Sequence, residues 1–162
     1  MSELNYFASD SPLEEKPNPY VKLLSVNQAL EMGIEVDLHL QDNFDQDKPD
    51  VVLFCSDETK FVYPNIFPID KDEYYDDIGT TKEFCAVLEW DYSDDTVDHV
   101  LEYIHSHLKK AAELELWSKW LGQGKVPKGM KKAQCTISDL TVDRLIEFYT
   151  TQLDFQCLTV RG

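Results

Sequence analysis

The acidic segment 70–77 holds the densest group of oxygen ligands in the sequence, the chemistry that a calcium ion requires. Hard cations are bound by several carboxylate oxygens from one flexible loop. Aligned as a calcium-binding loop from Asp70, the segment has Asp72 and Asp76 at ligand positions. It also has Tyr75 where glycine is required and Thr81 where a bidentate glutamate should close the site. The pattern therefore favours a solvated acidic loop, and we predict no metal site.

A second group of side chains that could do chemistry lies on an expected helix after Ser93. Asp95, His99 and Glu102 have the spacing i, i+4 and i+7, so they share one stripe of that helix. A carboxylate–imidazole–carboxylate set could serve acid–base chemistry or bind a metal. The segment has no second histidine four residues from His99, which favours an exposed polar face instead.

Residues 122–129 contain three glycines and two lysines, a composition that can bind phosphate through backbone N–H groups. The spacing does not match a P-loop, and neither Ser nor Thr follows Lys125. No nucleophile elbow or dinucleotide-binding signature occurs elsewhere. We therefore predict a flexible connection between two strands, and no cofactor.

The four cysteines are far apart in the sequence and form no C-x-x-C pair, which argues against zinc. Each lies in an apolar segment, as buried free thiols do in a reducing cytoplasm. The alternative is a catalytic thiol, which would need a base and an electropositive surrounding. We predict packed thiols and a cytoplasmic protein.

Charge is the strongest compositional signal, because 31 acidic residues against 15 lysines and arginines give a formal charge of −16. Residues 119–132 run against this trend, with five lysines and neither Asp nor Glu. A strongly negative protein repels nucleic acid and anionic membrane surfaces and attracts basic proteins. No apolar run is long enough for a transmembrane helix. We predict a basic protein partner and binding to neither nucleic acid nor membranes.

The elements that must position these residues are read from periodicity and capping signals. We expect a flexible lead over residues 1–19 and a small β-rich portion with one short helix over residues 20–80. In that portion, Ser25 and Gln28 form a capping box, and Gly33 ends the helix. Strands are expected at residues 20–24, 34–40, 50–56 and 59–63, and Pro64 and Pro68 are expected to end regular structure.

The portion over residues 81–162 predicts a β-α-β-β-α-β order, which resembles the ferredoxin-like arrangement and makes the chain an α+β protein. The expected strands cover residues 83–90, 113–121, 132–137 and 155–160, with helices capped by Ser93 and Thr141. Residues 111–121 could instead continue the preceding helix, since Ala, Glu and Leu are strong helix formers. The alternation of Leu, Glu and Trp there favours a strand. The two portions are expected to pack as one globule.

Trp117 shares a face of the expected strand with Glu113, Glu115 and Lys119. An exposed tryptophan among carboxylates is typical of a binding hot spot, although coverage of Trp117 by the N-terminal half is an equal alternative. The candidate partner-binding residues are Trp117, Asp70, Asp72, Asp76, Asp77, Asp91 and Asp95.

These patterns predict a non-catalytic, acidic interaction protein with a basic partner, for example an inhibitor or immunity-type protein that neutralises a nuclease or toxin. The alternative is a small-molecule-binding protein or a carboxylate-based enzyme with a cleft between the two halves, using groups such as Asp91 and Asp95. A homo-oligomer that pairs edge strands is a third possibility.

Overall fold

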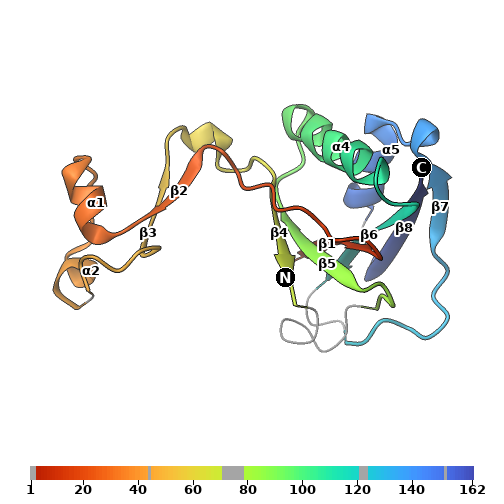
Figure 1. Cartoon of the computed structure of the whole chain (residues 1–162), viewed down its shortest axis with the longest axis horizontal. Helices are drawn as coiled ribbons and strands as arrows, with labels where there is room; N and C mark the ends of the chain where they lie inside the picture. Colours follow the sequence, from red (N-terminus) through yellow and green to blue (C-terminus); the bar gives the residue numbers. More distant parts are fainter. Residues whose placement is uncertain (1–2, 44, 71–78, 121–123, 152) are drawn as a thin grey trace. The chain divides into compact units, whose positions relative to one another are not determined.

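The computed structural model describes residues 3–43, 45–70, 79–120, 124–151 and 153–162. The chain divides into two compact units, which are described separately (Figure 1). Unit 1 is formed by residues 1–17 and 64–162, and unit 2 is formed by residues 18–63.

Unit 1 is built on one six-stranded sheet with the strand order β4-β5-β1-β6-β8-β7. Every neighbouring pair is antiparallel except β7 and β8, which are parallel. The strands are β1 Glu3–Ser9, β4 Asn65–Ile69, β5 Phe84–Glu89, β6 Glu113–Trp120, β7 Ala133–Thr136 and β8 Phe155–Arg161.

Strand β1 lies in the interior of the sheet, between β5 and β6, so the flexible lead predicted for residues 1–19 is wrong for residues 3–9. Phe7 points to one face and Tyr6 to the other, and both are fully buried. Asn5 and Ser9 break the apolar run, which made the segment resemble a polar terminus. Both are nevertheless buried on the face of the sheet that they share with Phe7, where Asn5 Nδ2 donates to Tyr92 OH at 3.3 Å and Ser9 Oγ meets His107 Nε2 of α4 at 2.8 Å.

Helices α4 Asp94–Leu108 and α5 Val142–Thr150 cover one face of this sheet (Figure 1). Ser93 begins α4, and its backbone N–H donates to Thr96 Oγ1 at 3.0 Å. Thr141 begins α5 and accepts from the backbone N–H of Arg144 at 3.2 Å. The core between helices and sheet includes Phe7, Leu88, Val97, Val100, Ile104, Leu114, Leu116, Leu145, Tyr149 and Leu158.

The opposite face of the sheet carries a smaller core centred on two aromatic rings. Tyr6 and Trp117 stack with centroids 5.7 Å apart and ring planes 5° from parallel. Val126 and Met130, from the segment before β7, pack against this cluster. Side chains on both faces of the central strands are therefore buried, which explains the continuous apolar run of β5.

The predicted order of elements after residue 80 is confirmed, since β5, α4, β6, β7, α5 and β8 follow one another along the chain. Residues 113–120 form a strand and not a continuation of α4. The protein is α+β. The ferredoxin-like arrangement is not confirmed, because β1, from outside this segment, lies between β5 and β6.

Unit 2 consists of β2 Val21–Leu24, α1 Val26–Glu31, α2 Leu38–Asn43, β3 Val52–Cys55 and the 3-10 turn η1 Glu58–Lys60. The capping box is confirmed: Gln28 N–H donates to Ser25 Oγ at 3.2 Å, and Ser25 N–H donates to Gln28 Oε1 at 2.8 Å. Gly33 has a φ of +74°, a left-handed conformation that glycine adopts without strain. Leu24, Val26, Ala29 and Val36 form the small buried core.

Three secondary-structure predictions around unit 2 are wrong. Residues 34–40 do not form a strand, because Asp37 accepts the N–H of His39 at 2.7 Å and α2 begins at Leu38. Residues 59–63 do not form a strand either: Asp57 accepts the N–H of Thr59 at 3.0 Å and begins η1. Pro68 does not end regular structure, because β4 is an edge strand, where a missing N–H is tolerated.

Candidate functional site

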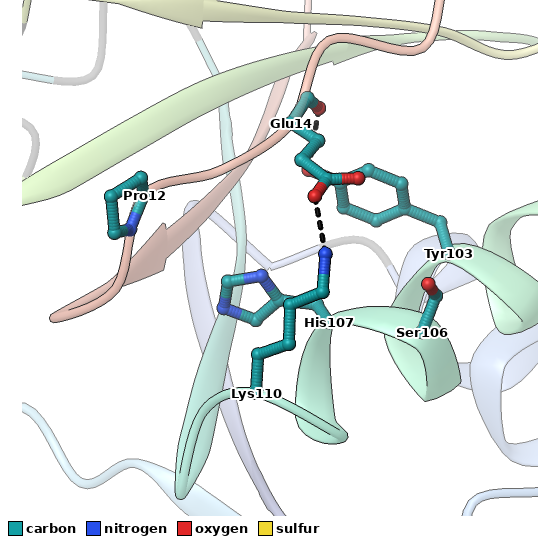
Figure 2. A pocket seen from close by; sticks show the side chains of 6 residues that line it. All are labelled: Pro12, Glu14, Tyr103, Ser106, His107 and Lys110. Carbon is teal, nitrogen blue, oxygen red and sulfur yellow. Dashed lines mark hydrogen bonds and ion pairs between the residues drawn. The ribbon is translucent and has the colours of Figure 1, made fainter.

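A small pocket of about 30 Å³ lies beside the C-terminal half of α4 in unit 1 (Figure 2). Its lining residues come from α4, from the turn after it and from the segment that follows β1. They are Pro12, Glu14, Tyr103, Ser106, His107 and Lys110. Tyr103, Ser106, His107 and Lys110 share one side of the helix because they are three or four residues apart.

The polar groups of this pocket are used to hold the segment after β1 against α4. Tyr103 OH donates to the backbone carbonyl of Glu14 at 2.9 Å, and Lys110 Nζ donates to the Glu14 carboxylate at 2.5 Å. The hydrogen bond from Lys110 lowers the pKa of Glu14, and burial raises the pKa of Tyr103. At neutral pH the contact is thus a lysine–carboxylate pair beside a neutral phenol.

His107 and Ser9 form the one arrangement here that resembles a nucleophile and its base. The two side chains meet at 2.8 Å, between His107 Nε2 and Ser9 Oγ. Burial lowers the pKa of His107, so the imidazole is neutral at pH 7. However, Ser9 is 0% exposed, and its Oγ also accepts the N–H of Ser11 at 3.1 Å. A substrate has no approach to such a hydroxyl, so the pair connects β1 to α4.

A buried charged cluster occupies the other face of the sheet, around Glu115. This side chain accepts hydrogen bonds from Trp117 Nε1 at 2.8 Å, from Thr80 Oγ1 at 2.6 Å and from Lys132 Nζ. Lys132 also lies over the Trp117 ring, with Nζ 5.1 Å from the centroid. Both carboxylate oxygens therefore have donors, as a buried charge requires.

The structure places the predicted partner-binding residues in different environments. Asp91 and Asp95 are exposed around the first turn of α4, and Asp70 is exposed just after β4. Trp117 is 1% exposed, so it offers no surface to a partner, and Tyr6 of β1 is among the residues that cover it. Asp72, Asp76 and Asp77 lie outside the described residues. Of the members that the structure describes, Asp91 and Asp95 are neighbours through their place around the start of α4.

The thiols of Cys135 and Cys157 do not have the properties of catalytic nucleophiles. Burial raises the pKa of Cys157 to about 12, and burial also raises the pKa of Cys135. Cys85 is buried, while Cys55 is half-buried in unit 2, and none of the four cysteines forms a disulfide. A thiol with a raised pKa is protonated at pH 7 and reacts slowly.

Within residues 3–43, 45–70, 79–120, 124–151 and 153–162, no group of three His, Cys, Asp or Glu side chains is placed to hold a metal ion. Across the same residues, no helix combines the length and the apolar character needed to cross a lipid bilayer. Comparison with known proteins adds no further constraint. No family model, curated protein or solved structure matches this chain. Its function has to be argued from the geometry.

Unit 2 carries a surface that the sequence reasoning missed. Most of the large hydrophobic side chains that are exposed lie in unit 2, namely Leu23, Leu30, Met32, Leu38, Leu53 and Phe61. Leu23 and Leu53 are directly opposite each other in the β2–β3 pair. The available signal was the continuous apolar run within residues 50–56, where we predicted a strand. Such a run also fits a strand with one apolar face uncovered.

Proposed function

We propose that this protein is a non-catalytic binding protein for a basic protein partner, with an inhibitor of immunity type as the concrete form. The observation that carries the proposal is the excess of carboxylates on the surface. The chain has a formal charge of −16, and several of its basic side chains form ion pairs with carboxylates of unit 1. These pairs are Lys82 with Asp10 and Glu113, Lys110 with Glu14, Lys132 with Glu115, and Arg161 with Glu113.

Exposed carboxylates outside these pairs are found on both units. Asp91, Asp95, Asp98 and Glu102 are exposed on and before α4 in unit 1. Exposed carboxylates also surround β3 in unit 2, at Asp50, Asp57 and Glu58 among others. Such a field increases the association rate with a basic protein and weakens as salt is added.

The chemistry of the described groups supports binding over catalysis. The Ser9–His107 pair is buried, the thiol pKa values of Cys135 and Cys157 are raised, and the pocket beside α4 is small. Free thiols fit a reducing compartment such as the cytoplasm. The alternative, a small-molecule site or carboxylate enzyme between the two halves, stays a prediction, as does a homo-oligomer formed through an edge strand.

The test is affinity capture with a graded release. The immobilised protein is exposed to cell lysate at low salt, and bound proteins are released by rising salt and identified by mass spectrometry. An unrelated acidic protein of equal charge density is the control. We expect one basic protein to be retained at salt concentrations that release the proteins shared with the control. If both columns release the same proteins at the same salt, the proposal is wrong.

A functional assay then tests the inhibitor form. If the retained protein is a nuclease or toxin, adding an equimolar amount of this protein should abolish its activity. Full activity of the partner within the complex would contradict inhibition while leaving the binding function intact.

A further inference from the structure

The two-stranded sheet of unit 2 has one covered face and one uncovered face. Leu24, Val52 and Phe54 belong to the core with α1 and the residues around it. Successive residues of a strand point to opposite faces, so Val21, Leu23, Leu53 and Cys55 form the other face. We call these four residues the ribbon face. Leu23 is 53% exposed and Leu53 is 54% exposed, although leucines opposite each other normally lie in a core.

The same sheet has open edges. Among the described residues, β2 and β3 pair only with each other. Ser56 N–H donates to the carbonyl of Tyr20 at 2.9 Å, which makes Tyr20 and Ser56 a hydrogen-bonded pair. Antiparallel pairs alternate between hydrogen-bonded and non-hydrogen-bonded, so Leu23 and Leu53 form a non-hydrogen-bonded pair. The backbone N–H and C=O of Leu53 therefore point away from β2, toward the open edge of β3.

The charges around the edge of β2 and the edge of β3 differ, and the difference favours the edge of β3 as a site for a basic partner. Asp50 precedes β3, and Asp57 and Glu58 follow it; all three are exposed. Hydrogen bonds from Thr59 lower the pKa of Asp57, so its carboxylate is charged at neutral pH. On β2, by contrast, the exposed Lys22 lies within the strand. The edge of β3 thus combines outward backbone groups, an apolar side chain and carboxylates at both ends.

We propose that the edge of β3 binds an extended segment of the basic partner as a third strand. The apolar side chains of that segment would lie beside Leu53 and continue the row formed by Leu23 and Leu53 on the ribbon face. Its lysines or arginines would lie at the strand ends, near Asp50, Asp57 and Glu58. Main-chain hydrogen bonds provide affinity in this mode, and side-chain chemistry provides selectivity. The inference rests on the proposed function, from which the partner's charge is taken.

The probe is a synthetic peptide, Lys-Lys-Val-Thr-Val-Thr-Val-Lys-Lys, with a fluorescent label at its N-terminus. Binding to the full chain is measured by fluorescence anisotropy at low and physiological salt. Two peptides serve as controls: one has Ser in place of each Val, and the other has Glu in place of each Lys. We expect the probe to bind about tenfold more tightly than either control, which corresponds to about 1.4 kcal/mol.

Variants of the protein locate the binding edge. Leu53→Thr removes the apolar side chain but keeps a residue that favours strands, and it should weaken probe binding about tenfold. Leu153→Thr is the matched control, because Leu153 is 52% exposed and lies in unit 1. It should change the affinity less than twofold. Leu53→Lys, a second variant at an exposed position, should weaken binding further by repelling the probe.

Hydrogen exchange tests the backbone pairing directly. With saturating probe, the Leu53 amide should exchange at least tenfold more slowly, because its N–H becomes hydrogen-bonded. Two further probes are methylated on the backbone, one at the peptide nitrogens of all three valines and the other at those of both central threonines. Alternate N–H groups of a bound strand face β3, so only one of these two sets of nitrogens donates to it. We therefore expect one methylated probe to lose binding and the other to keep it.

The outcomes separate this inference from the proposed function. If the Val and Ser peptides bind equally, or if Leu53→Thr and Leu153→Thr have equal effects, the β3 edge is not the binding site, although a basic partner remains supported. If neither cationic peptide binds even at low salt, the proposed function itself is contradicted.

Discussion

Units 1 and 2 both contain strands that are apolar on two sides, but they bury these strands differently. In unit 1, α4 and α5 cover one face of the sheet, and Val126 and Met130 pack on the other. In unit 2, the core around Leu24 and Val26 covers one face of the β2–β3 pair, and Leu23 and Leu53 on the ribbon face stay exposed. The comparison shows that a strand sequence does not determine whether both of its faces are covered.

The difference has consequences for stability and for binding. A two-stranded sheet is marginally stable in water without further packing, whereas a six-stranded sheet with two cores is not. An apolar surface that a partner covers also contributes to affinity in proportion to the area buried. We therefore expect unit 1 to be the more stable part of the chain, and unit 2 is the part in which we propose a binding edge.

The largest expected effect comes from truncating the core of unit 1. Leu116 is 0% exposed on β6, so Leu116→Ala should lower the free energy of unfolding by about 3 kcal/mol. Leu53→Ala in unit 2 should lower it by less than about 0.5 kcal/mol. Urea unfolding is followed by far-UV circular dichroism, which reports both units, and by tryptophan fluorescence, which reports unit 1 because Trp90, Trp117 and Trp120 all lie there. Equal losses for the two variants would remove the distinction between the units.

The next effect concerns the buried charge at Glu115. Lys132→Met leaves the Glu115 carboxylate without its cationic partner and should destabilise unit 1 by about 2 kcal/mol. The double variant Glu115→Gln with Lys132→Met should recover about half of that loss, because no buried charge is left unpaired. Thermal unfolding of the single and double variants provides the measurement. A double variant that is less stable than Lys132→Met would show that the carboxylate itself stabilises the sheet.

A pH-dependent loss of stability is expected in unit 1 from His107. Burial lowers its pKa below the ordinary value of 6.5, so the folded state favours the neutral imidazole. The stabilising contribution is complete above pH 6.5 and is lost as the pH falls toward the folded-state pKa. Between pH 7 and pH 5, the urea midpoint should fall less for His107→Gln than for the native chain. The neighbouring groups are Ser9, Glu14 and Lys110, and equal slopes would exclude His107 as the cause.

The smallest effect separates the two acidic surfaces. Asp50→Asn with Glu58→Gln, which flank β3 in unit 2, should weaken binding of the cationic probe several-fold at low salt. Asp91→Asn with Asp95→Asn in unit 1 should change that affinity less than twofold and should cost about 0.5 kcal/mol of stability near the α4 N-terminus. Fluorescence anisotropy with both double variants decides the question. A larger loss of affinity for the unit 1 variant would show that the probe binds near α4 and not at β3.

Local signals predicted much of the secondary structure after residue 80. Ser93 and Thr141 begin their helices as expected, and the alternation at residues 113–120 correctly indicated a strand. These signals work because capping and periodicity depend on neighbours in the sequence. The central position of β1 could not be read in this way, because its partners β5 and β6 are about 80 to 115 residues away in the sequence.

For the candidate binding residues too, the sequence predicted what depends on neighbouring residues and missed what depends on distant ones. The exposed positions of Asp91 and Asp95 follow from their place around a helix start, which the sequence indicates. The burial of Trp117 depends on Tyr6 and Lys132, which are distant in the sequence. The exposure of Leu53 likewise depends on which elements pack on β3.

By itself, the sequence determined the charge of this protein, its α+β class, and the caps and periodicity of most helices and strands, because these are properties of composition and of adjacent residues. The tertiary structure decided the strand order, the burial of Trp117 and the exposure of the ribbon face. These depend on contacts between segments far apart in the chain, where an apolar residue is buried only if another element packs against it.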